Sequence, residues 1–119
     1  MGIEIEVYDE NVVAHVYGEL SMNNIKDVDD AIAKEIAKEP EVIGLNCKYL
    51  KHIDSYAINH FVKIARKAKE NNITIVMFDL SEQIKFILET INLDKLVPIE
   101  SRDAFEERIS RKVNDIDLS

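Results

Sequence analysis

The first part of the chain alternates apolar and polar positions in the manner of a β-hairpin. Residues 3–7 alternate apolar and charged side chains, which is the pattern of a half-buried strand. The turn-type cluster Asp9-Glu10-Asn11 separates them from a second apolar run at residues 12–17, which Gly18 interrupts. Two strands so closely spaced predict an antiparallel hairpin.

Three more apolar runs, at residues 42–45, 73–78 and 96–99, predict three further strands. Helix-periodic stretches follow the second to the fifth strand, and Pro40 ends the first of them. The apolar positions that define the helices are Ile25, Val28, Ile32 and Ile36 in the first; Ile58, Phe61, Val62, Ala65 and Ala68 in the second; Ile84, Ile87, Leu88 and Ile91 in the third; and Phe105 and Ile109 in the last.

The predicted order is β-β-α-β-α-β-α-β-α. Strands that alternate with helices indicate right-handed crossovers, so we expect a single α/β domain with a mixed, mostly parallel sheet and packed helices. The domain is expected to span residues 1–113, and residues 114–119 are expected to form a flexible C-terminal tail. The predicted core consists of Val42, Ile43, Leu45, Phe61, Ile73, Ile75, Val76, Ile87 and Leu88.

Composition narrows the class of protein. Of the 119 residues, 46% are hydrophobic and 32% are charged, as in an ordinary soluble globular protein. The net charge of −8 argues against a nucleic-acid partner, because such binding needs a basic surface. No apolar run is long enough to span a membrane and the N-terminus does not have the pattern of a signal peptide, so we expect a cytoplasmic protein without a membrane span.

The side chains that commonly carry catalysis or bind metals are few and scattered. Cys47 is the single cysteine, which excludes an intramolecular disulfide, and its place after an apolar run predicts a buried, inert thiol. His15, His52 and His60 have no metal-ligand spacing. No glycine-rich phosphate loop and no Gly-x-Ser-x-Gly motif is present, so we expect neither a cofactor nor a metal, and a protein that is not an enzyme.

The pair Asp54-Ser55 lies between a predicted strand and a predicted helix. A hydroxyl at this place is on or beside the first helical turn, where free backbone N–H groups favour an added phosphate. The simpler interpretation is that Asp54 or Ser55 caps the helix. In an open α/β sheet such a site follows the carboxyl end of a strand, where ligands and modifications act.

Three stretches in this order carry a family resemblance: Gly18-Glu19-Leu20, Ile53-Asp54-Ser55 and residues 84–93. Together with the order of elements, they make the chain resemble a STAS domain of the anti-sigma factor antagonist kind. The resemblance implies that Ser55 is phosphorylated by a serine kinase that is also the anti-sigma factor. It further implies that the unmodified form binds this partner and frees the sigma factor, and that a phosphatase resets the switch.

A partner surface is expected where residues 18–24 and 54–59 meet, because both segments follow strands at the presumed carboxyl edge of the sheet. Ser55 is expected to be accessible and close to Ser21. The residues expected to form this surface are Gly18, Glu19, Ser21, Asn23, Asp54, Ser55, Tyr56 and Asn59. The family usually has Asp where this chain has Ser21 and Asn46, which predicts a less acidic edge. Tyr56 stands where the family has a small hydroxyl residue. Its bulk predicts either an interface anchor or a partly buried aromatic at the start of the helix.

Two other functions stay open at this stage. One is a STAS scaffold or accessory subunit that is used constitutively in a larger assembly, as in stressosome-like or lipid-transporter-associated proteins. The other is a small nucleotide-binding or catalytic α/β domain, which the missing phosphate loops disfavour.

Overall fold

The computed structural model describes the backbone of residues 2–118 and the side chains of residues 2–110. Five strands, four α-helices and a short 3₁₀ helix follow one another along this part of the chain. In order they are β1 (Gly2–Tyr8), β2 (Asn11–Leu20), α1 (Ile25–Ile36), β3 (Val42–Ile53), α2 (Ser55–Glu70), β4 (Thr74–Phe78), α3 (Glu82–Thr90), η1 (Leu93–Lys95), β5 (Ile99–Glu100) and α4 (Arg102–Leu118).

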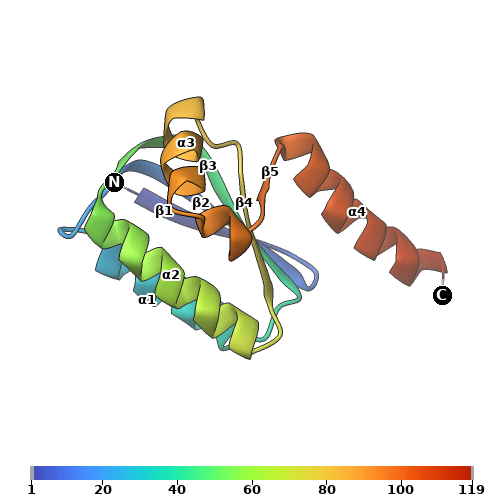
Figure 1. The fold of residues 1–119 in the computed structure, drawn as a ribbon. Helices are drawn as coiled ribbons and strands as arrows, with labels where there is room; N and C mark the ends of the chain where they lie inside the picture. The colour runs from blue at the N-terminus through green and yellow to red at the C-terminus, as the bar shows by residue number, and fades with distance from the viewer. Residues whose placement is uncertain (1, 119) are drawn as a thin grey trace.

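The five strands form one sheet in the order β1-β2-β3-β4-β5. β1 pairs antiparallel with β2, whereas each later pair is parallel. The predicted hairpin and mostly parallel sheet are therefore confirmed. Because β2, β3 and β4 run in the same direction, the helices that follow β2 and β3 begin at the same edge of the sheet. Figure 1 shows α1 and α2 side by side, and the two helices contact each other.

One face of the sheet packs against α1, α2 and α3, and the opposite face packs against α4. The larger core joins one face to α1, α2 and α3, and includes Phe61 and Leu88. On the opposite face, Phe105 of α4 stacks on Phe78 with 4.3 Å between the ring centroids. The Phe105 ring also lies against Gly44, where an added Cβ would come within 2.2 Å of it. Gly44 thus lets α4 approach the sheet closely.

Two strands are longer than the apolar runs predicted. β3 continues to Ile53 rather than ending near Leu45, so that it reaches the start of α2 directly. β2 continues through Gly18 to Leu20, with register shifts at this end and a φ of 90° at Gly18. The glycine thus sits in an irregular part of the strand instead of ending it. At the other edge, β5 comprises Ile99–Glu100 and starts just after Pro98, later than predicted.

The third helix buries less of its apolar surface than predicted. Ile84 and Leu88 are buried, but Ile87 is 38% exposed and Ile91 is 48% exposed. The prediction that Ile87 belongs to the core is therefore wrong, as is the assignment of Ile91 to the buried face. α3 has only 9 residues and packs along a narrow line, so neighbouring apolar positions face outward. The other eight predicted core residues are buried.

The C-terminal segment is helical up to Leu118, whereas a tail was expected from residue 114. α4 continues from Arg102 to Leu118, so residues 114–118 belong to a helix in the structure, whereas Ser119 lies outside the described residues. The flexibility expected of residues 114–119 stays a prediction. Phe105 is buried and Ile109 is partly buried against the same cluster, as predicted for the inward face of this helix.

Candidate functional site

Two segments meet at the edge of the sheet where β2 and β3 end. Leu20 is the last residue of β2, and Ile53 is the last residue of β3, with which it pairs. The backbone N–H of Asp54 donates a hydrogen bond to the carbonyl of Leu20 at 3.0 Å. The segment before α1 and the start of α2 are therefore joined through the backbone at this edge.

The Asp54 carboxylate joins the same two segments a second time. Its Oδ1 accepts a hydrogen bond from the backbone N–H of Ala57 at 2.8 Å, which caps α2. Its Oδ2 accepts one from the backbone N–H of Met22 at 3.1 Å. One carboxylate thus satisfies a donor at the start of α2 and a donor in the segment before α1. The expectation that Asp54 or Ser55 caps the helix is confirmed for Asp54.

Side chains also hold the segment before α1 in a compact turn. The amide of Asn24 accepts from the backbone N–H of Ser21 at 3.0 Å and donates to the carbonyl of Glu19 at 2.8 Å. The Ser21 hydroxyl oxygen accepts from the backbone N–H of Asn23 at 3.2 Å. Because these bonds are local, the turn is shaped by its own sequence and is then fixed to α2 by Asp54.

Ser55 is the first residue of α2 and is exposed. It lies among the free N–H groups of a first helical turn, where negative charge is favourable. Tyr56 is 50% exposed and Asn59 is exposed on the next turn. The predicted arrangement, in which the loop at Gly18 to Asn24 lies beside the start of α2, is thus present. Figure 1 shows the two helices beginning at the same end of the molecule.

Sequence reasoning missed two features of this edge. Met22 is 66% exposed and its backbone is bonded to Asp54, yet it lies in a polar loop that gives no apolar periodicity. His60 lies one turn after Tyr56, with 5.0 Å between the ring centroids. The Nδ1 atom of His60 is hydrogen-bonded to the carboxylate of Asp29 on α1. The spacing of four residues could have indicated the contact between the two rings.

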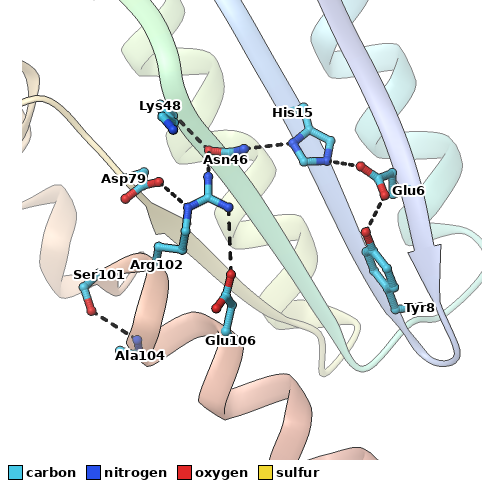
Figure 2. Close-up of polar contacts among 10 residues, drawn as sticks. All are labelled: Glu6, Tyr8, His15, Asn46, Lys48, Asp79, Ser101, Arg102, Ala104 and Glu106. Carbon is cyan, nitrogen blue, oxygen red and sulfur yellow. Dashed lines mark hydrogen bonds and ion pairs between the residues drawn. The ribbon is translucent and has the colours of Figure 1, made fainter.

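Asn46 does not belong to this edge. It lies in the middle of β3, seven residues before Ile53, which corresponds to about 23 Å along a strand. Its side chain is on the sheet face that packs against α4, where its Oδ1 accepts from the backbone N–H of Lys48 at 3.1 Å (Figure 2). The expectation that Asn46 makes the edge near Ser55 less acidic is therefore wrong, whereas Ser21 does lie there.

Asn46 instead takes part in a row of polar contacts across the sheet (Figure 2). Its Nδ2 lies 2.8 Å from Nδ1 of His15, whose Nε2 lies 2.6 Å from a carboxylate oxygen of Glu6. The Tyr8 hydroxyl donates to the same carboxylate. The hydrogen bonds from Tyr8 and His15 lower the pKa of Glu6, and the carboxylate raises the pKa of Tyr8. On the other side of Asn46, the Arg102 guanidinium lies 3.5 Å from Asn46 Oδ1, and its Nε donates a hydrogen bond to Oδ2 of Asp79 at 2.7 Å.

The hydrogen bonds around Asn46 and His15 can all be assigned a donor and an acceptor, as in a network that stabilises the fold. Because the backbone N–H of Lys48 can only donate, the Asn46 oxygen must face it and the Asn46 amide nitrogen must face His15. His15 Nδ1 is then the acceptor, so its Nε2 carries the hydrogen and donates a hydrogen bond to the Glu6 carboxylate. His15 is thus hydrogen-bonded at both ring nitrogens.

Cys47 is an inert thiol in this fold. Its side chain is 1% exposed, and burial raises the pKa of the thiol to about 12. Among residues 2–110, whose side chains are described, no three His, Cys, Asp or Glu side chains gather closely enough to hold a metal ion. Within the described part of the chain, no helix is long and apolar enough to cross a membrane.

Comparison with known proteins agrees with this architecture. The family model described as the STAS domain matches residues 2–114, almost the whole chain. The chain belongs to the STAS domain family. No curated protein matches it by sequence.

Several solved structures share this STAS fold. A putative anti-sigma factor antagonist from Thermotoga maritima, tm1081, superposes with a TM-score of 0.82 at 20% identity, covering 91% of this chain and 94% of its own. The anti-sigma factor antagonist SpoIIAA in its unphosphorylated form gives 0.76 at 17% identity, with 92% and 96% covered. A sulfate transporter family protein from Wolinella succinogenes gives 0.73 at 12% identity, with 89% and 92% covered. These likenesses establish the STAS fold of the chain.

Proposed function

We propose that this STAS domain is an anti-sigma factor antagonist, a protein-binding module that is switched by phosphorylation of Ser55. The observation that carries the proposal is the exposed Ser55 at the start of α2, next to the partly buried Asp54, whose carboxylate joins α2 to the segment before α1. In its unmodified form the module binds an anti-sigma factor that is also its serine kinase. A phosphatase reverses the modification, and the module acts in the cytoplasm without catalytic activity of its own.

The surroundings of Ser55 fit a reversible phosphate. A phosphoserine carries a charge of about −1.5 to −2, which is favourable at a helix N-terminus and unfavourable at a C-terminus. Because Ser55 is exposed, the phosphate enters water and displaces no packed side chain. The cost falls on the complex, since a partner packed over this turn would have to desolvate the phosphate. Among the solved structures of similar fold, SpoIIAA has also been determined in a phosphorylated form.

The proposed partner surface consists of two exposed strips on either side of Asp54. Glu19 and Asn23 lie on the first strip, and Ser55, Tyr56 and Asn59 lie on the second. Gly18 and Ser21 shape the first strip, as the φ of 90° at Gly18 and the turn at Ser21 indicate. This division assigns direct contact with the partner to the exposed side chains and a supporting role to the others.

The proposal is tested by the modification state and by binding. Intact mass of the protein from its own cells, followed by sequencing of the modified peptide, is expected to show one phosphate on Ser55. In titrations against the serine kinase that co-purifies with the wild type, Ser55→Asp is expected to bind weakly and Ser55→Ala constitutively. Ser110→Asp, which adds the same charge to an exposed serine of α4, is the matched control and should bind like the wild type.

Thermal melts separate the switch from a folding defect. Ser55→Asp is expected to leave the melting temperature nearly unchanged, because its charge lies at a helix N-terminus. Equal affinity of Ser55→Asp and Ser55→Ala for the kinase would refute the switch.

The likeness to the sulfate transporter protein supports a second candidate, a STAS scaffold or accessory subunit used constitutively. In that case the protein recovered from its cells would be unmodified, and it would elute in a larger assembly whether residue 55 is Ser, Ala or Asp.

A further inference from the structure

Tyr56 follows Ser55 in the chain, and its ring is partly exposed to solvent and partly in contact with another side chain. It is 50% exposed on the first turn of α2. The Tyr56 ring contacts the ring of His60, which lies one turn along the helix at a centroid distance of 5.0 Å and a tilt of 41°. The ring therefore stands at the surface with one side supported by its own helix.

The support continues to the neighbouring helix. His60 and Asp29 are joined through Nδ1 and Oδ2, and their side chains are only 20% and 26% exposed. Asp29 belongs to α1 and His60 to α2, so the pair crosses the boundary between the two helices. Asp29, His60 and Tyr56 thus form a row in which only the last side chain is half exposed. We call it the Tyr56 row.

A supported aromatic side chain is suited to binding. A side chain that is ordered before association loses less conformational freedom on binding, and this lowers the cost of forming a complex. Tyrosine offers a large apolar surface and a hydroxyl, and is among the residues that dominate the energy of protein interfaces. Met22 is 66% exposed on the segment that is hydrogen-bonded to Asp54, and it adds a second apolar side chain, a flexible one, at the same edge.

We propose that Tyr56 is the anchor by which the partner recognises this module, and that His60 and Asp29 position it. The proposal rests on the function proposed above, since it concerns the same partner. It specifies the partner chemistry: a protein surface with an apolar recess beside its serine-binding cleft, and a hydrogen-bond acceptor within the recess for the Tyr56 hydroxyl. Since Glu19 and Asp54 lie on the same edge, the rim of the recess is neutral or basic.

The expected effects follow from these roles. Tyr56→Ala removes the anchor and should weaken binding of the co-purified serine kinase by about 10- to 100-fold. Tyr56→Phe removes only the hydroxyl and should lose less. Asp29→Ala leaves the anchor in place but frees His60, and should weaken binding by about 3- to 10-fold. Asp30→Ala, which removes an exposed carboxylate next along α1, is the matched control and should bind like the wild type.

A double-mutant cycle distinguishes positioning from a general structural role. Kd values for the co-purified kinase are measured by titration calorimetry for the wild type, Asp29→Ala, Tyr56→Ala and the double variant. If Asp29 acts through Tyr56, the loss caused by Asp29→Ala should vanish in the Tyr56→Ala background. An equal loss in both backgrounds would overturn the positioning role.

The same measurements separate failure of the anchor from failure of the proposed function. If Tyr56→Ala binds like the wild type while Ser55→Asp binds weakly, the anchor is refuted and the switch stands. If neither substitution changes binding, the proposed function fails as well. Steady-state phosphorylation gives a second readout: Tyr56→Ala should raise the KM of the kinase for this protein much more than it lowers kcat. A fall in kcat at constant KM would contradict an anchor.

Discussion

Removal of the Asp54 carboxylate tests the geometry of the site without reference to any partner. Asp54→Ala loses the cap on Ala57 and the bond to Met22, whereas Asp54→Ser keeps a hydroxyl oxygen that can cap Ala57 but is too short to reach Met22. Loss of an N-cap costs about 1 kcal/mol. The second bond involves a charged acceptor, and its partly exposed position places it near the low end of the usual range, at about 1 kcal/mol.

The free energy of unfolding should therefore fall by about 2 kcal/mol in Asp54→Ala and by about 1 kcal/mol in Asp54→Ser. Urea denaturation at pH 7 measures both values, and an unchanged m-value shows that the same surface is exposed on unfolding. Amide hydrogen exchange adds a local readout. The Met22 amide should exchange faster in both variants, whereas the Ala57 amide should exchange faster only in Asp54→Ala.

Two results would refute this reasoning. A loss below about 0.5 kcal/mol in Asp54→Ala would show that the two bonds contribute nothing net, since surface substitutions usually have effects of that size. Equal losses in Asp54→Ala and Asp54→Ser, with unchanged exchange at Met22, would show that only the cap matters. The carboxylate would then not join the two segments in solution.

Three further predictions concern the body of the fold. Phe61→Ala should lower the free energy of unfolding by about 3–5 kcal/mol in urea melts, because its ring is 3% exposed; a loss below about 1 kcal/mol would contradict its core position. Cys47, with a thiol pKa of about 12, should resist alkylation at pH 8 unless the protein is unfolded, and stability should fall as the pH rises from 9.0 toward that value. Tyr8→Phe should raise the pKa of Glu6 toward 4.5, as followed by NMR of its carboxyl carbon; an unchanged value would show that the Tyr8 hydroxyl does not bond Glu6 in solution.

The sequence predicted the order of elements because each element has its own periodic signal. It did not predict the length of β3, because the apolar run marks only the part that lies between two strands. Residues 42–46 pair with β4 on one side and with β2 on the other, whereas the part from Tyr49 to Ile53 pairs with β2 alone. That outer part carries exposed residues such as Lys51 and His52, so it has no apolar run that would indicate a strand.

The burial of α3 could not be predicted for a related reason. Ile84, Ile87, Leu88 and Ile91 have the spacing of one helical face, yet only two of them meet the core. Spacing shows which side chains share a face, but the depth at which a short helix packs is set by the elements beneath it. The position of Asp54 and Ser55 at the start of α2 agrees with the sequence prediction, because the start of a helix after a strand is a local signal. Asn46 was misplaced because its strand continues beyond it.

Ser55 does not cap its helix, unlike Ser81 and Ser101, which also lie at the starts of helices. Asp54 supplies the oxygen that caps α2, whereas the hydroxyl oxygens of Ser81 and Ser101 themselves cap α3 and α4. A phosphate on Ser55 therefore breaks no capping bond, as a reversible switch requires. Ser55→Ala should change the free energy of unfolding by less than about 0.5 kcal/mol, and Ser81→Ala and Ser101→Ala should each cost about 1 kcal/mol in the same urea melts. If Ser55→Ala lowers the free energy of unfolding as much as the other two substitutions, the Ser55 hydroxyl is needed to stabilise the helix. Phosphorylation of Ser55 would then destabilise the fold.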